Sequence, residues 1–337
     1  MLFDVYKNKT ILVTGDTGFK GSWLTIWLKL LGAEVYGFSK NIPTNPSNFS
    51  ASGLDKTSTT EFSDIKDLTK LKSLVMQVQP DYIFHLAAQA LVKESYVSPT
   101  ETFLTNAMGS ANIIEASRIL NKKVNIIMIT SDKAYDNVEW KWGYRENDAI
   151  GGKDPYSASK GMAELVIRSY FESFIKKEKS NIKIGITRAG NVIGGGDWAK
   201  DRIIPDCIKS WSDGKTVDIR NPQATRPWQH VLEPLSGYLT LGAYLDEKES
   251  INGQAYNFGP ESKQDYSVEI LINEMNKYWK NVKWNDLSEK TQDFHEAGLL
   301  KLNCDKAQFD LNWSPTLEFK DTVRYTAEWY KEFYENE

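Results

Sequence analysis

The sequence predicts an α/β protein in which a doubly wound parallel sheet carries a smaller C-terminal lobe. Short runs of apolar and β-branched residues alternate with helical patterns along most of the chain, which is typical of such a sheet. The first run leads through a glycine-rich turn into a helix. With 337 residues, the chain is long enough for one large α/β unit and a second lobe.

The first predicted strand, residues 11–14, and the helix at residues 22–31 flank three glycines. Their spacing is that of the Rossmann turn, in which the first glycine permits a tight turn, the second admits a pyrophosphate and the third lets the helix lie close to the sheet. We therefore predict a dinucleotide cofactor at this turn. The residues expected to bind it are Gly15, Thr17, Gly18, Phe19, Lys20 and Gly21.

The second strand, residues 34–39, is expected to end beside the adenosine ribose of the cofactor. A carboxylate at this position would indicate NAD, but the residues are Ser39 and Lys40. Lys40 could face a 2′-phosphate, which would indicate NADP, or be a solvated loop residue. These residues alone therefore do not exclude NADP.

The segment 41–60 has little periodicity and is predicted to be a long loop over the edge of the cofactor site. A third strand is expected to end near Asp64 and Ile65, before a helix at residues 67–78. The Asp64 carboxylate could contact adenine or act as a turn or cap residue.

A fourth strand, residues 81–88, ends in small residues such as Ala87, which let the backbone pass close to a cofactor. His85 is interpreted as a packed strand residue, because no cluster of His, Cys or carboxylates with metal-ligand spacing accompanies it. We expect no metal site.

A helix at residues 98–119 precedes the fifth strand, residues 124–130, which delivers Ser131, Asp132 and Lys133 at its C-terminal end. Ligand chemistry in open α/β sheets gathers at that edge. Downstream, Tyr156 and Lys160 are four residues apart, so they share one helix face and the ammonium can lie near the phenol. This favours the phenolate and makes Tyr156 a candidate base.

In the later half of the sequence, further strands are predicted to end at residues 188–193 and near residue 257. Helices are predicted at residues 267–279, after residue 305 and at residues 317–334. His295 is expected to be exposed. We predict a dinucleotide-binding domain of residues 1–187 plus about 228–258, and a substrate lobe of about 188–227 plus 259–337.

Several long segments resemble the extended short-chain dehydrogenase/reductase family. Within it the chain is similar to the nucleotide-sugar 4,6-dehydratases, and most similar to their CDP-glucose branch; the match covers nearly the whole chain. The segments are 15–23 (GDTGFKGSW), 130–137 (TSDKAYDN), 139–146 (EWKWGYRE), 188–198 (RAGNVIGGGDW) and 220–234 (RNPQATRPWQHVLEP).

The resemblance implies a reaction on a nucleotide-diphosphate hexose, with CDP-glucose favoured. Tyr156 would take the proton of the sugar 4-hydroxyl, which Ser131 also binds, while hydride passes from C4 to the cofactor. Lys160 would lower the pKa of Tyr156 and bind the nicotinamide ribose, and Asn106 would belong to the cofactor site. Loss of water across C5 and C6 and return of hydride to C6 would regenerate the cofactor, which favours a bound NAD.

Asp132 matches the acid that expels the C6 hydroxyl in the dTDP-sugar members of this group. Lys133 departs from their pattern, since they place a Glu there as the base at C5, although it agrees with the CDP-glucose branch. A desolvated Lys133 could act as that base, or it could stay charged and stabilise the enolate. Alternatively, the two residues form only a local ion pair.

Substrate recognition is expected from the later half, where arginines offer a planar fork that suits phosphate oxygens. Arg226 lies in the most specific motif, while Arg202 and Arg220 could equally be solvated. The residues expected to bind substrate are Glu94, Ser95, Asn191, Arg202, Arg220, Arg226 and Trp228.

A net charge of −4 and a pI near 5.7 argue against nucleic acid or an anionic membrane as the main partner. Two cysteines fit a reducing compartment, and neither a signal-peptide core nor a bilayer-spanning run is present in the sequence. We expect a cytoplasmic enzyme. The resemblance implies a homodimer and a role in deoxysugar biosynthesis, such as that of the lipopolysaccharide O-antigen.

Two rival functions remain open. A 4-epimerase or 4-reductase for sugar nucleotides shares Tyr156 and Lys160 but needs no acid at C6. A dinucleotide-sensing protein without turnover would keep only the fold, which the combination of Ser131, Tyr156 and Lys160 argues against.

Overall fold

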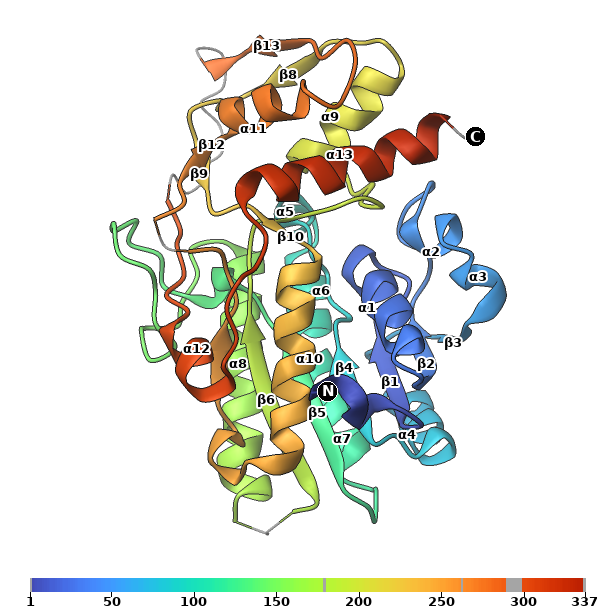
Figure 1. Cartoon of the computed structure of the whole chain (residues 1–337). Helices are drawn as coiled ribbons and strands as arrows, with labels where there is room; N and C mark the ends of the chain where they lie inside the picture. The colour runs from blue at the N-terminus through green and yellow to red at the C-terminus, as the bar shows by residue number, and fades with distance from the viewer. Residues whose placement is uncertain (1, 178–179, 262, 289–298, 336–337) are drawn as a thin grey trace.

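The computed structural model describes residues 2–177, 180–261, 263–288 and 299–335. Within these residues, seven parallel strands form the central sheet (Figure 1). They are β1 (Thr10–Thr14), β2 (Glu34–Ser39), β3 (Thr59–Phe62), β4 (Tyr82–His85), β5 (Val124–Ile129), β6 (Ile182–Arg188) and β11 (Ala255–Asn257). Their order, β11-β6-β5-β4-β1-β2-β3, winds outward in both directions from β1. The predicted doubly wound fold is confirmed.

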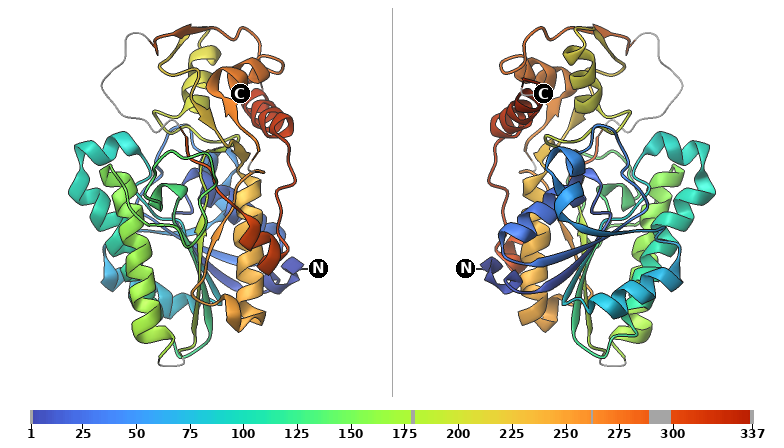
Figure 2. Two further views of the ribbon diagram at one scale, coloured as in Figure 1. Left: turned by 90° about the vertical axis from the view of Figure 1, so that its left-hand side faces the viewer. Right: turned by 90° about the vertical axis from the view of Figure 1, so that its right-hand side faces the viewer.

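Helices cover both faces of this sheet (Figure 2). On one face Leu28 and Leu241 belong to one apolar core, and on the other Ile113 and Ile167 belong to a second. The first face is covered by η1 (Leu2–Tyr6), α1 (Phe19–Leu30), α10 (Leu232–Glu247) and α12 (Asp305–Leu311). The second is covered by α4 (Leu68–Val78), α7 (Gly109–Ser117) and α8 (Pro155–Tyr170). Because both faces are buried, the central strands are continuous apolar runs.

Two predictions about local structure need correction. The segment 41–60 contains two short helices, α2 (Asn48–Ala51) and α3 (Leu54–Thr57), and the start of β3. The Ser47 hydroxyl caps α2 by accepting a hydrogen bond from the Ser50 N–H at 3.1 Å. The predicted long helix is broken into α5 (Val92–Val97), α6 (Pro99–Phe103), the π-helical turn η2 (Leu104–Met108) and α7. Pro99 begins α6, because proline fits the first helical turn but not a helix interior.

A third apolar core lies beyond the carboxyl edge of the sheet, at the top of Figure 1, and includes Trp198, Trp211 and Tyr330. Its helices are α9 (Ile203–Ser212), α11 (Val268–Met275) and α13 (Phe319–Glu335). Its two-stranded pairs are β7 (Val192–Ile193) with β10 (Gln229–His230), β9 (Thr225–Arg226) with β12 (Tyr266–Ser267), and β8 (Val217–Ile219) with β13 (Trp284–Asp286). The short turns η3 (Asp132–Ala134), η4 (Phe171–Ile175) and η5 (Glu249–Ile251) complete the elements of the described ranges.

The chain enters this lobe after β6, returns to the sheet for α10 and β11, and then leaves again. We therefore keep the predicted division into residues 1–187 plus about 228–258 and about 188–227 plus 259–337 as a proposal, with α12 moved to the first domain. Ala307 and Leu311 of α12 pack into the core of the sheet. His295 lies outside the described residues. Every helix in the described ranges is too short or too polar to cross a membrane.

Candidate active site

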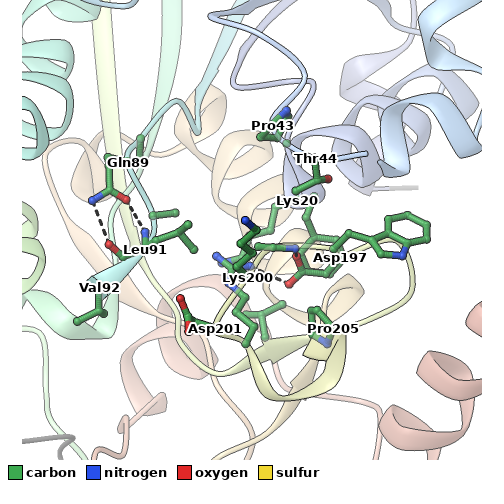
Figure 3. A pocket seen from close by; sticks show the side chains of 18 of the residues that line it. Lys20, Pro43, Thr44, Gln89, Leu91, Val92, Asp197, Lys200, Asp201 and Pro205 are labelled. Atoms are coloured by element: carbon green, nitrogen blue, oxygen red, sulfur yellow. Dashed lines mark hydrogen bonds and ion pairs between the residues drawn. The ribbon is translucent and has the colours of Figure 1, made fainter. Parts of the chain in front are cut away.

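A cavity of about 1060 Å³ lies between the carboxyl edge of the sheet and the C-terminal lobe. It extends from the glycine turn after β1 to Arg220, which follows β8. Figure 3 shows part of its lining: Pro43 and Thr44 from the loop after β2, Gln89 to Val92 from the segment after β4, and Asp197 to Pro205 before and within α9. The two parts of the molecule thus form one site together.

The five residues predicted to be catalytic all line this cavity. The Ser131 hydroxyl, directly after β5, donates to Asp132 Oδ1 at 3.0 Å, and the Lys133 N–H donates to Ser131 Oγ at 3.2 Å. The Ser131 side chain lies close enough to the Tyr156 hydroxyl to lower its pKa. Lys160 follows one turn later on α8 and is 6% exposed.

The position of Tyr156 depends on where α8 begins. Asp154 is the N-cap, and its Oδ1 accepts the Ser157 N–H at 2.9 Å. Pro155 occupies the first turn, where proline is tolerated. The sequence Asp-Pro-Tyr therefore fixes the start of the helix and places the Tyr156 ring in the cavity.

Burial raises the pKa of Tyr156 above its ordinary value, because it disfavours the phenolate. The hydrogen bond with Ser131 and the charge of Arg202 oppose this shift, and Asp132 adds to it. That Lys160 lowers the pKa of Tyr156 stays a prediction. Burial also lowers the pKa of Lys160 to about 8, while Glu164 acts in the opposite direction.

Lys20 reaches the same region from the start of α1. Burial, and next the charge of Arg202, lower its pKa to about 8, and Asp132 and Asp197 act against this shift. Arg202 Nη1 donates to Asp197 Oδ2 at 2.8 Å. The sequence reasoning missed Asp197, although it stands in the GGGDW segment. Lys20 therefore brings its positive charge close to Asp132 and Lys160, although it belongs to the glycine turn.

The glycine turn has the geometry of an anion site. The N-cap of α1 is Gly18, which has no side chain to satisfy the first N–H groups of the helix. A Cβ at Gly21 would lie 2.0 Å from the Gly15 carbonyl oxygen, so only glycine lets the helix approach this closely. The other predicted residues of the turn, Thr17 and Phe19, also line the cavity.

Ser39 is engaged by a carboxylate that the sequence reasoning missed. Asp16 is 1% exposed and accepts hydrogen bonds from the hydroxyls of Ser39 and Thr60, each at 2.6 Å. Ser39 Oγ also accepts the Thr17 N–H at 3.3 Å. Ser39 lines the cavity, but its proton is directed to Asp16 rather than to a ribose. Burial raises the pKa of Asp16 despite these hydrogen bonds.

The adenosine end of the cavity is lined by Ser39, Lys40, Asp64, Ile65, Ala87 and Glu101. The Lys40 ammonium lies 3.0 Å from Asp64 Oδ2 and 3.6 Å from Glu101 Oε1. A 2′-phosphate near Lys40 would therefore also lie near two carboxylates, which already neutralise the charge of the Lys40 ammonium. This arrangement fits NAD better than NADP.

Six of the residues predicted to bind substrate line the cavity: Glu94, Asn191, Arg202, Arg220, Arg226 and Trp228. Arg226 is 9% exposed and donates to the Thr225 carbonyl at 2.8 Å. Trp228 is 6% exposed, and its indole N–H donates to the Tyr266 carbonyl at 3.0 Å. The planar guanidinium of a buried arginine suits a phosphorylated ligand.

Ser95 and Asn106 do not line the cavity and need correction as ligand contacts. Ser95 is fully buried; its Oγ accepts the Tyr156 N–H at 3.1 Å and donates to the Val92 carbonyl at 2.6 Å. Asn106 accepts the Gln89 N–H at 2.8 Å and donates to Ser159 Oγ at 2.7 Å. Both support the backbone around the site, because their polar groups are already satisfied by the protein.

His85 is packed as predicted. It is 3% exposed, its Nδ1 lies 2.8 Å from Thr14 Oγ1, and burial lowers its pKa to about 3, so it is neutral. In the part of the chain that the structure describes, no group of three or more His, Cys, Asp or Glu residues could hold a metal ion. Cys207 and Cys304 are free thiols.

Comparison with known proteins places the chain in a family. The family model described as GDP-mannose 4,6 dehydratase matches residues 12–326. The chain belongs to this family. It is 43% identical over 330 residues to a CDP-glucose 4,6-dehydratase of Salmonella typhimurium, covering 97% of this chain and 91% of that protein. It is 22% identical to a UDP-glucose 4-epimerase of Mycoplasma pneumoniae over 334 residues, or 96% and 97% of the two chains.

Among solved structures, the fold is similar to that of DesIV, a dTDP-glucose 4,6-dehydratase from Streptomyces venezuelae, crystallised with NAD and TYD. The TM-score is 0.79 at 23% identity, and the match covers 96% of this chain and 97% of DesIV. The predicted membership of the nucleotide-sugar dehydratases and the predicted fold are thus confirmed.

In this member of the GDP-mannose 4,6 dehydratase family, three kinds of chemical group line one cavity. Tyr156 and Ser131 form a hydroxyl pair, Asp132 is a carboxyl group, and Lys133 and Lys160 carry amines. Such a set can exchange protons at several neighbouring carbons of one ligand. The glycine turn and the arginines of the lobe line the same cavity.

Proposed function

We propose that the protein is an NAD-dependent hydro-lyase that converts a nucleotide-diphosphate hexose, CDP-glucose first, into its 4-keto-6-deoxy product and water. The observation that carries this proposal is that Tyr156, Ser131, Asp132 and Lys133 line one cavity between the glycine turn and the arginines of the lobe. The 43% identity to a CDP-glucose 4,6-dehydratase supports the same reaction.

NAD fits the residues at one end of the cavity. The free N–H groups at the start of α1 would hold the pyrophosphate, Asp64 and Ile65 the adenine, and Lys160 the nicotinamide ribose. When bound, NAD would accept hydride from C4 and return it to C6. The pairing of Lys40 with Asp64 and Glu101 favours NAD over NADP.

Tyr156 opens the reaction as the base. Its phenolate takes the proton of the 4-hydroxyl while Ser131 donates a hydrogen bond to the same oxygen, and the C4–H bond breaks to leave a ketone. Because burial raises the pKa of Tyr156, the phenolate needs nearby positive charge, which Arg202 supplies in part. We assign the remainder to Lys160, one turn later on α8.

The elimination of water uses Lys133 as the base at C5 and Asp132 as the acid at C6. The ketone at C4 acidifies the C5 proton, whose removal we assign to Lys133 as the base. The C6–O bond then breaks, and the Asp132 carboxyl gives its proton to the departing hydroxyl, which leaves as water. An enone remains, and Lys133 returns the proton to C5 when hydride reaches C6, so Lys133 ends in its starting state. Asp132 ends as a carboxylate and Tyr156 as the phenol, so the proton taken from the 4-hydroxyl must pass from Tyr156 to Asp132 before the next turnover.

The diphosphate is assigned to the positively charged end of the cavity. Arg226 offers a buried guanidinium, and Arg202 and Lys20 add positive charge close to Asp132. Asn191 lines the same part of the cavity, with a φ of 52° that orients its backbone unusually for a non-glycine residue. Phosphate oxygens would replace Asp197 as partners of Arg202.

A homodimer is part of the proposal, because apolar side chains are exposed where η2 packs against α8. Leu104 and Met108 on η2 are 41% and 49% exposed, and Met162 and Leu165 on α8 are 44% and 57% exposed. A second copy would cover this stripe. Light scattering should give twice the mass of the 38.4 kDa chain, and Leu165→Glu should reduce it to that of a monomer. We place the enzyme in the cytoplasm and in deoxysugar biosynthesis such as that of the O-antigen.

The deciding experiment incubates the protein with CDP-glucose, dTDP-glucose, UDP-glucose and GDP-mannose, and identifies each product by mass and proton spectrum. Loss of one water from the sugar without net NADH formation is expected, with CDP-glucose turned over fastest. An epimer of unchanged mass would instead establish the 4-epimerase, a reaction to which Tyr156 and Lys160 also fit. No turnover of any sugar nucleotide would favour a sensing protein.

A further inference from the structure

A buried ion pair joins the catalytic helix to the sheet outside the cavity. Arg188 ends β6, and Glu164 lies on α8 one turn after Lys160. Arg188 Nε and Nη2 donate to the two carboxylate oxygens of Glu164, each at 2.7 Å. The two side chains are 4% and 5% exposed, and neither lines the cavity. The pair therefore lies outside the substrate contacts described above.

The pair is bound on both sides to segments that carry reacting groups. Glu164 Oε1 also accepts the hydroxyl of Thr130 at 2.6 Å, and Thr130 directly precedes Ser131. Arg188 Nη1 donates to the Tyr135 hydroxyl at 2.7 Å, and its guanidinium lies 4.7 Å from the centre of the Tyr135 ring. Tyr135 in turn donates to Asn257 Oδ1 at 2.8 Å. One network thus connects the ends of β5, β6 and β11 with α8.

A buried ion pair of this kind is weak support for stability, because removing both charges from water costs about as much as their attraction returns. The pair contributes orientation instead, because both hydrogen bonds of a bidentate pair form well in only one relative arrangement of the two side chains. The pair fixes α8 along and around its axis at the turn that follows Lys160. We propose that Glu164 and Arg188 are positioning residues that hold Tyr156 and Lys160 in register with Ser131 and Asp132.

Glu164 also acts on Lys160 through its charge. Burial lowers the pKa of Lys160 to about 8, and Glu164 is the carboxylate that opposes this shift. The other ionisable groups that face Lys160 are Lys20 on α1, which adds positive charge, and His85 on β4, which is neutral. Replacing Glu164 by Gln keeps an oxygen for Thr130 but removes the negative charge. Lys160 should then lose its proton at a lower pH.

The test rests on the proposed function and compares kcat and KM over pH for the wild type and Glu164→Gln. We expect kcat to fall about tenfold or more, because a small displacement of reacting groups is costly. KM should stay within about twofold, since Glu164 does not line the cavity. The alkaline limb should move by about half a pH unit or more toward lower pH. The Glu172→Gln control, which breaks an exposed ion pair at the end of the same helical segment, should change none of these.

Two further variants keep the proposal testable if Glu164→Gln does not fold. Tyr135→Phe retains both charges and removes one anchor of Arg188, so kcat should fall without a shift of the pH profile. The double variant Glu164→Met with Arg188→Met leaves no unpaired buried charge and should fold, with kcat about tenfold or more below wild type. Wild-type kcat and pH profile in the double variant would overturn the proposal.

A readout without substrate separates this proposal from the proposed function. The rate at which acetic anhydride acylates Lys160, followed by mass spectrometry over pH in the unliganded protein, reports the pKa of its amine. Glu164→Gln should lower that pKa even if none of the sugar nucleotides is turned over. An unchanged labelling profile together with an unchanged kcat would refute the role of Glu164.

Discussion

Adding a single methyl group at Gly190 should impair the dehydration step while C4 oxidation continues. A Cβ on Gly190 would lie 1.8 Å from Asp132 Oδ2 and 2.2 Å from its Cγ, whereas ordinary contacts begin at 3.4 Å. The carboxyl group must therefore move by roughly 1.6 Å in Gly190→Ala. A misplacement of about 1 Å costs about 10²-fold in rate, so we expect product formation to fall about 100-fold, or by about 2.7 kcal/mol.

The assay measures the 4-keto-6-deoxy product by mass and NADH by absorbance in the same reaction. Because the clash involves Asp132 and not Tyr156, C4 oxidation should continue in Gly190→Ala, and reduced cofactor should accumulate on the enzyme. Gly259→Ala is the matched control, since its Cβ would find its nearest neighbours at 3.6 Å or more. Product formation within about threefold of wild type in Gly190→Ala would refute the assignment of Asp132 as the acid.

Three further outcomes follow from the site and the core. Tyr156→Phe should lower kcat by about 10²- to 10⁴-fold while calorimetry gives an unchanged NAD affinity; retained turnover would exclude Tyr156 as the base. Activity should fall as pH rises through about 8, where Lys160 loses the proton whose charge favours the phenolate, and a profile flat to pH 10 would contradict this role. Glu233→Ala should lower the free energy of unfolding in urea by about 3 kcal/mol, because Glu233 Oε1 accepts hydrogen bonds from Thr316 N, Thr316 Oγ1 and Leu317 N. A loss below about 1 kcal/mol would contradict this role of Glu233.

The sheet and the glycine turn were predictable because their signals are local. An apolar run such as Val124–Ile129 can be buried on both faces only inside a parallel sheet, and the glycine spacing requires a strand before it and a helix after it. The segment 41–60 was predicted wrongly, because the four-residue helices α2 and α3 are too short to display a helical period.

The candidate site was predictable where residues follow the carboxyl ends of strands. Ser131 and Asp132 come directly after β5, so the topology brings them to the same edge as the glycine turn. The partners of buried polar groups were not predictable. Ser95 supports the Tyr156 N–H across 61 residues of chain, and Asp16 pairs with Thr60 across 44. A sequence indicates that a polar residue is present but not which distant group satisfies it.

The raised pKa of Tyr156 links the state of the base to the state of the cofactor. Burial disfavours the phenolate in the protein alone, and Arg202 offsets this only in part because it is paired with Asp197. If Tyr156 is the base, as proposed, bound oxidised NAD would add a positive charge that favours its phenolate, and reduction of the cofactor would remove that charge. The same electrostatics that start the oxidation of C4 would thus keep Tyr156 protonated through the elimination. That proton would then restore the Asp132 carboxyl, which gave its own proton to the departing hydroxyl.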